Sequence, residues 1–184
     1  FNTALFLVRG KGYYEEYKAQ QNLSDYNLND TSVADVIRRL WLNNYFYGQI
    51  TSLQYKTTKD ELTIGGSWSE YDGKHYGKLV WSEVKIPNDY QYYYFPATKA
   101  DENIYVKWLH NLNTKWNTFA DMQFRHVMHD MKGFEDNPTL FIKRDFNFFN
   151  PKAGISYTYS GWNAYMSYAL AHKEPNRDDF EASL

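Results

Sequence analysis

The stretch that decides the fold is residues 116–129, which read WNTFADMQFRHVMH. Its side chains alternate with a period of two, which is typical of a β-strand with one half-buried face. One face carries Trp116, Thr118, Ala120, Met122 and Phe124. The other carries Asn117, Phe119, Asp121, Gln123 and Arg125. The stretch therefore predicts a strand with one apolar side.

Three more stretches repeat this alternation, at residues 62–68, 153–159 and 162–170. Their apolar faces consist of Leu62, Ile64, Gly66 and Trp68; Ala153, Ile155, Tyr157 and Tyr159; and Trp162, Ala164, Met166, Tyr168 and Leu170. Their opposite faces are mostly small and uncharged, which suits a lumen that is packed or filled with water. Residues 45–55 alternate less cleanly because Gln49 shares a face with Tyr47 and Leu53, and residues 1–8 are apolar on both faces.

Short and long connections alternate along the chain. The short polar turns are residues 57–61, 111–115 and 160–161, and the long connections are 10–43, 72–98, 130–147 and a fourth that starts near His172. Outer-membrane barrels show this asymmetry, with short periplasmic turns and longer extracellular loops. We therefore predict an all-β, antiparallel, up-and-down meander that forms part of a transmembrane β-barrel with long extracellular loops.

Aromatic residues support that prediction. They make up 20% of the 184 residues, with 18 Tyr, 12 Phe and 6 Trp. One group lies beside the short turns: Tyr55, Trp108, Trp116, Tyr159 and Trp162. A second group, Tyr45, Tyr47 and Tyr71, lies near the loop ends. Two such groups at opposite strand ends are typical of the interfacial girdles of a membrane barrel.

The composition excludes several classes of protein. No cysteine is present, so a disulfide framework and a cysteine nucleophile are excluded. The net charge of −2 gives no reason to expect nucleic acid. The mean hydropathy of −0.72 is that of many soluble proteins, but a barrel with a polar lumen and polar loops reaches similar values. Neither a signal peptide nor a closing strand is recognisable, so we expect residues 1–184 to be a fragment of a longer protein.

One helix is expected inside the first long connection. Val33, Val36, Ile37, Leu40 and Trp41 fall at helical spacing. Ser32 can cap such a helix, and Asp35 adds favourable charge to its first turn. We expect this short loop helix to pack on the barrel rim.

Several motifs resemble the TonB-dependent outer-membrane receptors of the Bacteroides type. They are ALF at 4–6, RGKGYYE at 9–15, IRR at 37–39, WLNN at 41–44, YDG at 71–73, DFNFFNPKAG at 145–154 and AHKEPNRDDF at 171–180. The last two are the most specific. The resemblance covers almost the whole chain, residues 1–184, but only the later barrel of such a receptor, without its plug, its TonB-contacting segment or its terminal strand.

This resemblance implies a function for the parent protein. It implies a receptor in the cell outer membrane that imports a nutrient with energy transmitted by TonB, such as an iron–siderophore complex, haem or cobalamin. The expected partners are that ligand, outer-membrane lipid, and TonB through the missing N-terminal region. No cofactor is expected. Barrels of this family have about 22 strands and a plugged lumen, so this chain supplies only part of the wall.

Candidate ligand contacts come from three groups of residues. Two are aromatic segments near the loop ends, which can grip a ligand with amphipathic rings: Tyr13 and Tyr14, and Tyr92 and Tyr93. The third group combines lumen-facing Arg125 and His129 with a polar cluster after the last strand, Glu174, Asn176 and Arg177. For this last cluster, a charge-paired anchor of the loop is the expected role and ligand contact is the second.

No metal or catalytic site is expected. His126 and His129 are three residues apart, so on a strand they point to opposite faces and cannot chelate one ion unless the strand has ended or bulged there. Phosphate-binding loops, nucleophile elbows and helical metal motifs are absent from the sequence. We therefore expect a protein that is not an enzyme.

Two other architectures are compatible with the pattern. One is a soluble aromatic-rich β-sheet module, for example for carbohydrate, which requires a second sheet over the apolar face. The other is a small, complete, eight-stranded barrel. A fragment of a larger barrel has two open edges, so alone it is expected to dimerise or to curl into a different closed sheet.

Overall fold

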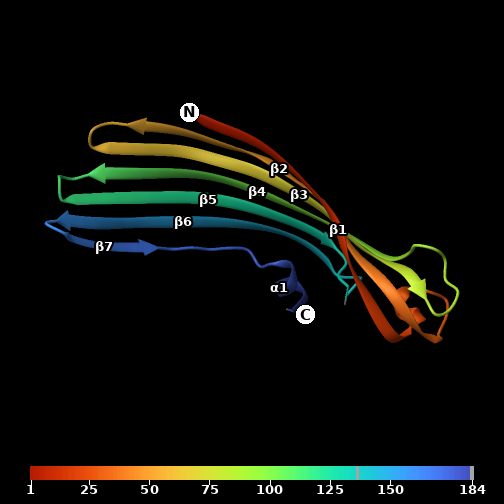
Figure 1. The fold of residues 1–184 in the computed structure, drawn as a ribbon. Coiled ribbons are helices and arrows are strands. Elements are labelled where there is room, and N and C mark those ends of the chain that lie inside the picture. Colours follow the sequence, from red (N-terminus) through yellow and green to blue (C-terminus); the bar gives the residue numbers. More distant parts are fainter. Residues whose placement is uncertain (136, 183–184) are drawn as a thin grey trace.

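The computed structural model describes residues 1–135 and 137–182, which form one antiparallel sheet. Its strands are β1 (Asn2–Asn22), β2 (Val33–Lys56), β3 (Asp60–Ser82), β4 (Tyr90–Asn111), β5 (Trp116–Lys132), β6 (Phe141–Tyr159) and β7 (Trp162–Ala169). Each strand pairs with the next in sequence order. The up-and-down meander is therefore confirmed. β1 and β7 form the two edges, and the sheet is not closed (Figure 1).

The three short turns lie at one end of the sheet and the longer connections at the other (Figure 1). The turns join β2 to β3, β4 to β5 and β6 to β7, as the sequence predicts. The longer connections are residues 23–32, 83–89 and 133–140, and Asp136 in the last of these lies outside the described residues. The connection between β1 and β2 contains the 3-10 helix η1 (Leu23–Tyr26).

The long loops expected at 10–43, 72–98 and 130–147 are a wrong prediction, because most of their residues belong to strands. β1 to β6 are 17 to 24 residues long, so they extend well beyond the alternating stretches. In these extensions both faces carry polar or charged groups, so the apolar alternation that identifies a strand is lost. Cross-strand contacts hold them together instead, such as Arg39 Nε to Glu15 Oε2 at 2.7 Å and the stacked rings of Trp41 and Tyr76.

The helix expected at residues 33–41 is also wrong: this segment is the start of β2. The misleading feature is a spacing of four, which satisfies both a helical period and a period of two. Val36 and Leu40 are four apart and share one face of the strand, where both are buried. Branched side chains such as Val36 and Ile37 also favour a pleated strand once neighbours exist on both sides.

Alternation gives the sheet two chemically different faces. The apolar face, as we call it, has its large hydrophobic side chains exposed: Leu5, Leu7, Leu53, Tyr55, Ile64, Trp68, Ile104, Val106, Trp108, Trp116, Met122, Phe124, Met128, Phe149, Tyr159, Trp162, Met166 and Tyr168. The other face, the polar face, carries Asn103, Asp121, Gln123 and Arg125 in the middle of the sheet. The predicted faces of residues 62–68, 116–125, 153–159 and 162–168 are confirmed, and Leu5 and Leu7 assign the facing of β1. Tyr71, in contrast, lies on the polar face, opposite Phe46 and Lys99.

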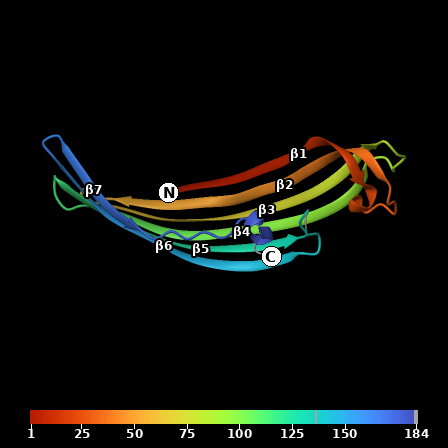
Figure 2. The ribbon, with the colours of Figure 1, turned by 90° about the horizontal axis from the view of Figure 1, so that it is seen from below.

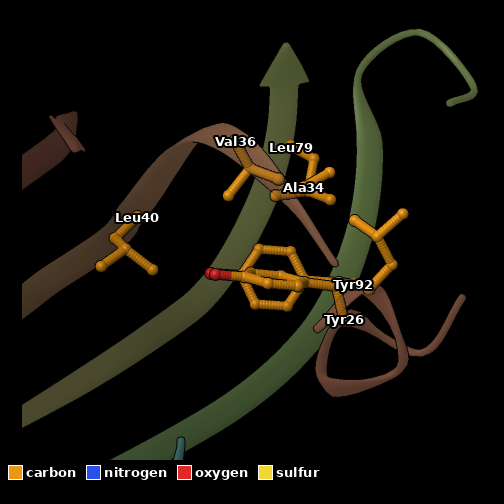
Figure 3. Close-up of a cluster of buried hydrophobic side chains, with 7 residues drawn as sticks. Tyr26, Ala34, Val36, Leu40, Leu79 and Tyr92 are labelled. Carbon is orange, nitrogen blue, oxygen red and sulfur yellow. The ribbon is translucent and has the colours of Figure 1, made fainter. Parts of the chain in front are cut away.

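Buried cores occur only at the long-connection end of the described residues. One cluster packs η1 against β2, β3 and β4 and consists of Leu23, Tyr26, Ala34, Val36, Leu40, Leu79 and Tyr92. Figure 3 shows the rings of Tyr26 and Tyr92 side by side, and their centroids are 4.9 Å apart. A second cluster contains Ala97, Met131 and Phe134. The middle of the apolar face, in contrast, is not covered by a second layer formed by any of the described residues.

The segment after β7 leaves the sheet at Leu170 and ends in the helix α1 (Arg177–Ala182), which the sequence analysis does not predict. It runs back across the sheet, as Figure 2 shows from below, and its contacts are with the polar face. Ser183 and Leu184, the end of the stretch expected to lack a closing strand, lie outside the described residues. Within the described ranges, no helix has both the length and the apolar character needed to cross a membrane.

Candidate functional site

A groove of about 620 Å³, the mouth groove, opens on the polar face at the long-connection end. Its floor includes Gly10 and Gly12, and a side chain at Gly12 would meet nothing within 4 Å. Tyr14, His75 and Tyr93 flank this floor. The volume is within the range of ordinary small-molecule sites. The floor lacks a side chain at Gly12, whereas Asn44 occupies the space above Gly10, so the rings of Tyr14 and Tyr93 can reach a ligand that lies over Gly12.

A smaller hollow of about 280 Å³ adjoins the mouth groove and shares Tyr93 and Glu135 with it. Its wall contains Arg38, whose guanidinium is 2.8 Å from Glu16 Oε2 and 2.8 Å from Glu135 Oε1. The Arg38 side chain is only 17% exposed. Two carboxylates therefore hold one arginine in place and tie the β5–β6 connection to β1 and β2.

The four candidate tyrosines occupy different environments. Tyr14 is exposed and faces the mouth groove, whereas Tyr13 lies on the opposite side of β1 against Trp41, with ring centroids 4.5 Å apart. Tyr92 is buried in the core of Figure 3, and its hydroxyl has no hydrogen-bond partner within the described residues. Tyr93 stacks on Phe95 and is half-buried. Tyr13, Tyr14 and Tyr93 all line the groove, and the alternation of β1 places the Tyr14 ring on the polar face.

A second polar site lies farther down the same face, where the segment after β7 contacts β4 and β5. Arg125 Nη2 is 2.5 Å from Asp101 Oδ2, and Arg125 Nη1 is 2.8 Å from Glu174 Oε2. Lys99 Nζ is 2.5 Å from Glu174 Oε1. Two cations and two carboxylates therefore form one network, which anchors the segment to the sheet through Glu174.

Glu174 is the most buried member of this network, with a side chain only 9% exposed. Burial acts to raise the pKa of this carboxyl group. Hydrogen bonds from Lys99 and Arg125 outweigh burial, and the pKa falls from the ordinary 4.5 to about 2. The ionised form is thus strongly favoured when the segment is docked.

The docked segment is expected to detach in acid. Because the pKa of Glu174 is lower when docked, its contribution is complete above about pH 4.5 and is lost as the pH falls towards about 2. The chain has no cysteine, so Ala182→Cys offers a unique spin-labelling position on α1. The spectrum of the label should narrow over that pH interval. In Glu174→Gln the label should already be mobile at neutral pH, and an unchanged wild-type spectrum down to pH 2 would contradict the anchor.

The other candidates also serve this docking. The Asn176 amide nitrogen donates to Asp179 Oδ2 at 2.8 Å, and the Asp179 amide nitrogen donates to Asn176 Oδ1 at 2.9 Å, which caps the start of α1. Arg177 Nη2 donates to the Gly133 carbonyl oxygen at 2.7 Å. Burial lowers the pKa of Arg177.

His129 lies beside the ion-pair network and is 8% exposed. It shares the polar face with Arg125 through the register of β4 and β5, while His126 lies on the apolar face. Among residues 1–135 and 137–182, no group of three or more His, Asp or Glu side chains could hold a metal ion. The arrangement offers aromatic stacking and hydrogen bonding to a ligand at the mouth groove, and a structural ion-pair network below it.

The residues that complete both sites are not recognisable from the sequence alone. For the network they are Lys99 and Asp101, and for the mouth groove and its neighbouring hollow they are Gly10, Gly12, Glu16, Arg38, His75 and Glu135. Asp101 and Arg125 are diagonal neighbours on two strands, because Asp101 pairs with Val127. Only the register of the sheet shows that they meet.

No protein-family model and no curated protein matches this chain.

Proposed function

We propose that this chain is the wall and mouth of an outer-membrane receptor that imports a nutrient with energy from TonB. The observation that carries the proposal is the apolar face, where large hydrophobic side chains stay exposed on all seven strands. A monomeric protein in water rarely exposes a contiguous apolar patch of this extent. Acyl chains of a bilayer would cover it without a further protein layer.

The arrangement of residues on the apolar face supports the proposal. On β5 the apolar run from Trp116 to Phe124 spans about 26 Å along the strand, or about 20 Å for a strand tilted by roughly 40°. That is most of the roughly 25 Å apolar band of a membrane barrel. Aromatic side chains lie at both margins of the band, next to the short turns and at Tyr47, Trp68, Phe124 and Phe149. Beyond the second margin follows a charged row that includes Arg9, Asp72, Asp130 and Lys143.

The soluble-module alternative has less support. It requires a second sheet packed on the apolar face, and the described residues form a single sheet. The ends of the sheet also differ, since short turns lie on one side and strand extensions with buried clusters lie on the other. This asymmetry is expected when one side faces the periplasm and the other reaches out from the cell.

The ligand is expected to bind at the mouth groove. The motifs that resemble TonB-dependent receptors, such as DFNFFNPKAG at 145–154, imply an iron–siderophore complex, haem or cobalamin. The groove supports a ligand with flat, partly apolar surfaces, because Tyr14 and Tyr93 present rings and His75 a donor and acceptor. Transport itself would require the plug and the TonB-contacting segment of the parent protein.

Membrane insertion of the chain is the primary test of the proposal. The denatured chain is diluted into phospholipid vesicles or into buffer, and β-structure is followed by circular dichroism and protease protection. We expect β-structure and protection in vesicles, and aggregation in buffer. A monodisperse β-protein in buffer without detergent would contradict the proposal. For the cargo, binding of siderophores, haem, cobalamin and glycans to the full-length receptor is compared.

Replacing Tyr14 is expected to weaken ligand binding. Tyr14→Ala removes an exposed ring from the mouth groove without opening a core, so folding should be retained. We expect about a tenfold loss of affinity, the effect of roughly 1.4 kcal/mol of lost contact. Calorimetric titration of the full-length receptor with its ligand measures it. The matched control is Tyr94→Ala, an exposed tyrosine of β4 that does not line the groove, and equal losses in both variants would rule out the groove as the binding site.

A further inference from the structure

A second groove, the outer groove, lies on the apolar face, away from the mouth groove and the ion-pair network. Its volume is about 660 Å³, and it crosses β2, β3, β4 and β5. Side chains at one end are apolar, namely Leu53, Ile64, Ile104 and Phe124. Gln49, Glu102 and His126 lie at the other end. The outer groove therefore has one apolar end and one polar end, as a lipid molecule has.

The outer groove exists because one strand lacks a side chain at its centre. Gly66 lies on the apolar face between Thr51 and Ile104 in the register of β2, β3 and β4. A Cβ atom at Gly66 would lie 2.7 Å from the Asn103 carbonyl oxygen, which is closer than real Cβ atoms come. Backbone spacing thus keeps this position free of any larger residue.

The polar end of the groove carries one negative charge, that of Glu102. Glu102 is the one formally charged side chain among the described residues that line it. The Glu102 side chain makes no ion pair or hydrogen bond within residues 1–135 and 137–182, although its backbone pairs with Trp68 and His126 in the sheet. Trp68 pairs with Glu102 across β3 and β4. A carboxylate beside an indole ring is a favourable site for an ammonium group, through charge and through cation–π attraction.

The orientation of the outer groove agrees with the apolar band. Its apolar end lies in the row of Leu53, Ile64, Val106 and Met122, in the middle of the band. The Glu102 end lies in the row of Trp68, at the margin of the band. A lipid whose acyl chain follows the groove towards the middle of the membrane would therefore place its head group beside Glu102.

We propose that the outer groove binds one phospholipid with an ammonium head group, such as phosphatidylethanolamine, with one acyl chain lying over Gly66. The proposal rests on the membrane location proposed above. The acyl chain fills the space between Leu53 and Phe124, and the ammonium group faces Glu102 and Trp68. An anionic head group, in contrast, would meet the Glu102 carboxylate with like charge.

Native mass spectrometry of the whole chain tests this site. The chain is folded in detergent micelles with equal amounts of phosphatidylethanolamine and phosphatidylglycerol of the same acyl chains, and retained lipids are counted. We expect one phosphatidylethanolamine per chain. Thr51→Phe should fill the groove, because an aromatic side chain opposite a glycine covers it without disturbing the ladder. Retention should then fall about tenfold, which corresponds to about 1.4 kcal/mol.

Two further variants sharpen the test. Glu102→Gln keeps the shape of the groove and should remove the preference for phosphatidylethanolamine over phosphatidylglycerol. Ala164→Phe adds the same bulk to the apolar face on β7, outside the groove, and should leave retention unchanged. Circular dichroism verifies that each variant has folded.

The outcomes separate this proposal from the membrane proposal. Failure of the wild-type chain to fold with detergent or lipid, together with folding in plain buffer, would overturn both. A chain that folds in micelles but retains the two lipids equally, or retains as much lipid after Thr51→Phe, would overturn the outer groove alone. A dimer mass that disappears in Thr51→Phe would assign the groove to a second copy of the chain and would also overturn lipid binding.

Discussion

Replacing Met122 by arginine is expected to destabilise the chain in a bilayer by about 2–4 kcal/mol, the cost of an arginine at the midplane on the lipid side of a barrel. Met122 is 54% exposed on the apolar face, so no packed core is disturbed. Its row across the sheet is Leu53, Ile64, Val106, Met122 and Pro151, which is apolar throughout. The loss of stability therefore reports whether Met122 contacts lipid. It is obtained from denaturant unfolding of chains folded into vesicles.

The neighbouring residue supplies the control. Gln123 lies on the polar face, where its Oε1 accepts from Asn150 Nδ2 at 3.3 Å. Gln123→Arg introduces the same charge one residue away and is expected to change stability by less than about 1 kcal/mol. Met122→Leu should be close to neutral. Equal destabilisation by the two arginine variants would show that the apolar face does not contact lipid.

Replacing Arg125 by methionine is expected to cost about 2–3 kcal/mol. The variant leaves Asp101 and Glu174 without their shared cation, and the usual cost of breaking a buried pair is about 3–5 kcal/mol. The side chains of Arg125 and Asp101 are each 20% exposed, so water solvates the unpaired carboxylates and lowers the free-energy cost. The loss should appear in denaturant unfolding and also as increased mobility of a label on α1.

Further substitutions test the same network. Adding Asp101→Asn and Glu174→Gln to Arg125→Met removes the unpaired charges and should recover part of the loss. Arg144→Met serves as the control, because Arg144 is an exposed cation on the polar face, opposite His129, and should cost less than about 0.5 kcal/mol. If Arg125→Met and Arg144→Met behave alike, the ion-pair network does not stabilise the fold.

Alternation of side chains predicts the part of each strand that lies in the apolar band. Residues 116–129 show why: a strand with one apolar face and one polar face must change chemistry at every residue. Short turns such as Ser160-Gly161 are also predictable. Both residues adopt positive φ, which glycine accepts readily and which a two-residue hairpin turn requires.

Alternation no longer identifies a strand where the surroundings of the strand change. Beyond the apolar band both faces of a strand carry polar or charged side chains, and residues such as Glu15 and Arg39 are compatible with loop or strand. The spacing of Val36 and Leu40 fits a helix and a strand equally. Pairing with β1 and β3 decides in favour of the strand, and the sequence of β2 alone does not contain that pairing.

The sequence by itself determined the strands of the apolar band, the order of short turns and the two chemically different faces, because these depend on a period of two within single segments. Only the tertiary structure decided which residues meet. Arg125 joins Asp101 and Glu174, Tyr14 and Tyr93 flank the mouth groove, and Gly66 opens the outer groove. Each of these sites brings together residues from different strands or segments, and the register of the sheet decides which residues meet. Register depends on backbone hydrogen bonds, which nearly every residue can make, so single segments do not reveal it. Residues 116–129 predict a strand with one apolar and one polar face. The neighbouring strands of the sheet decide which side chains each face contacts.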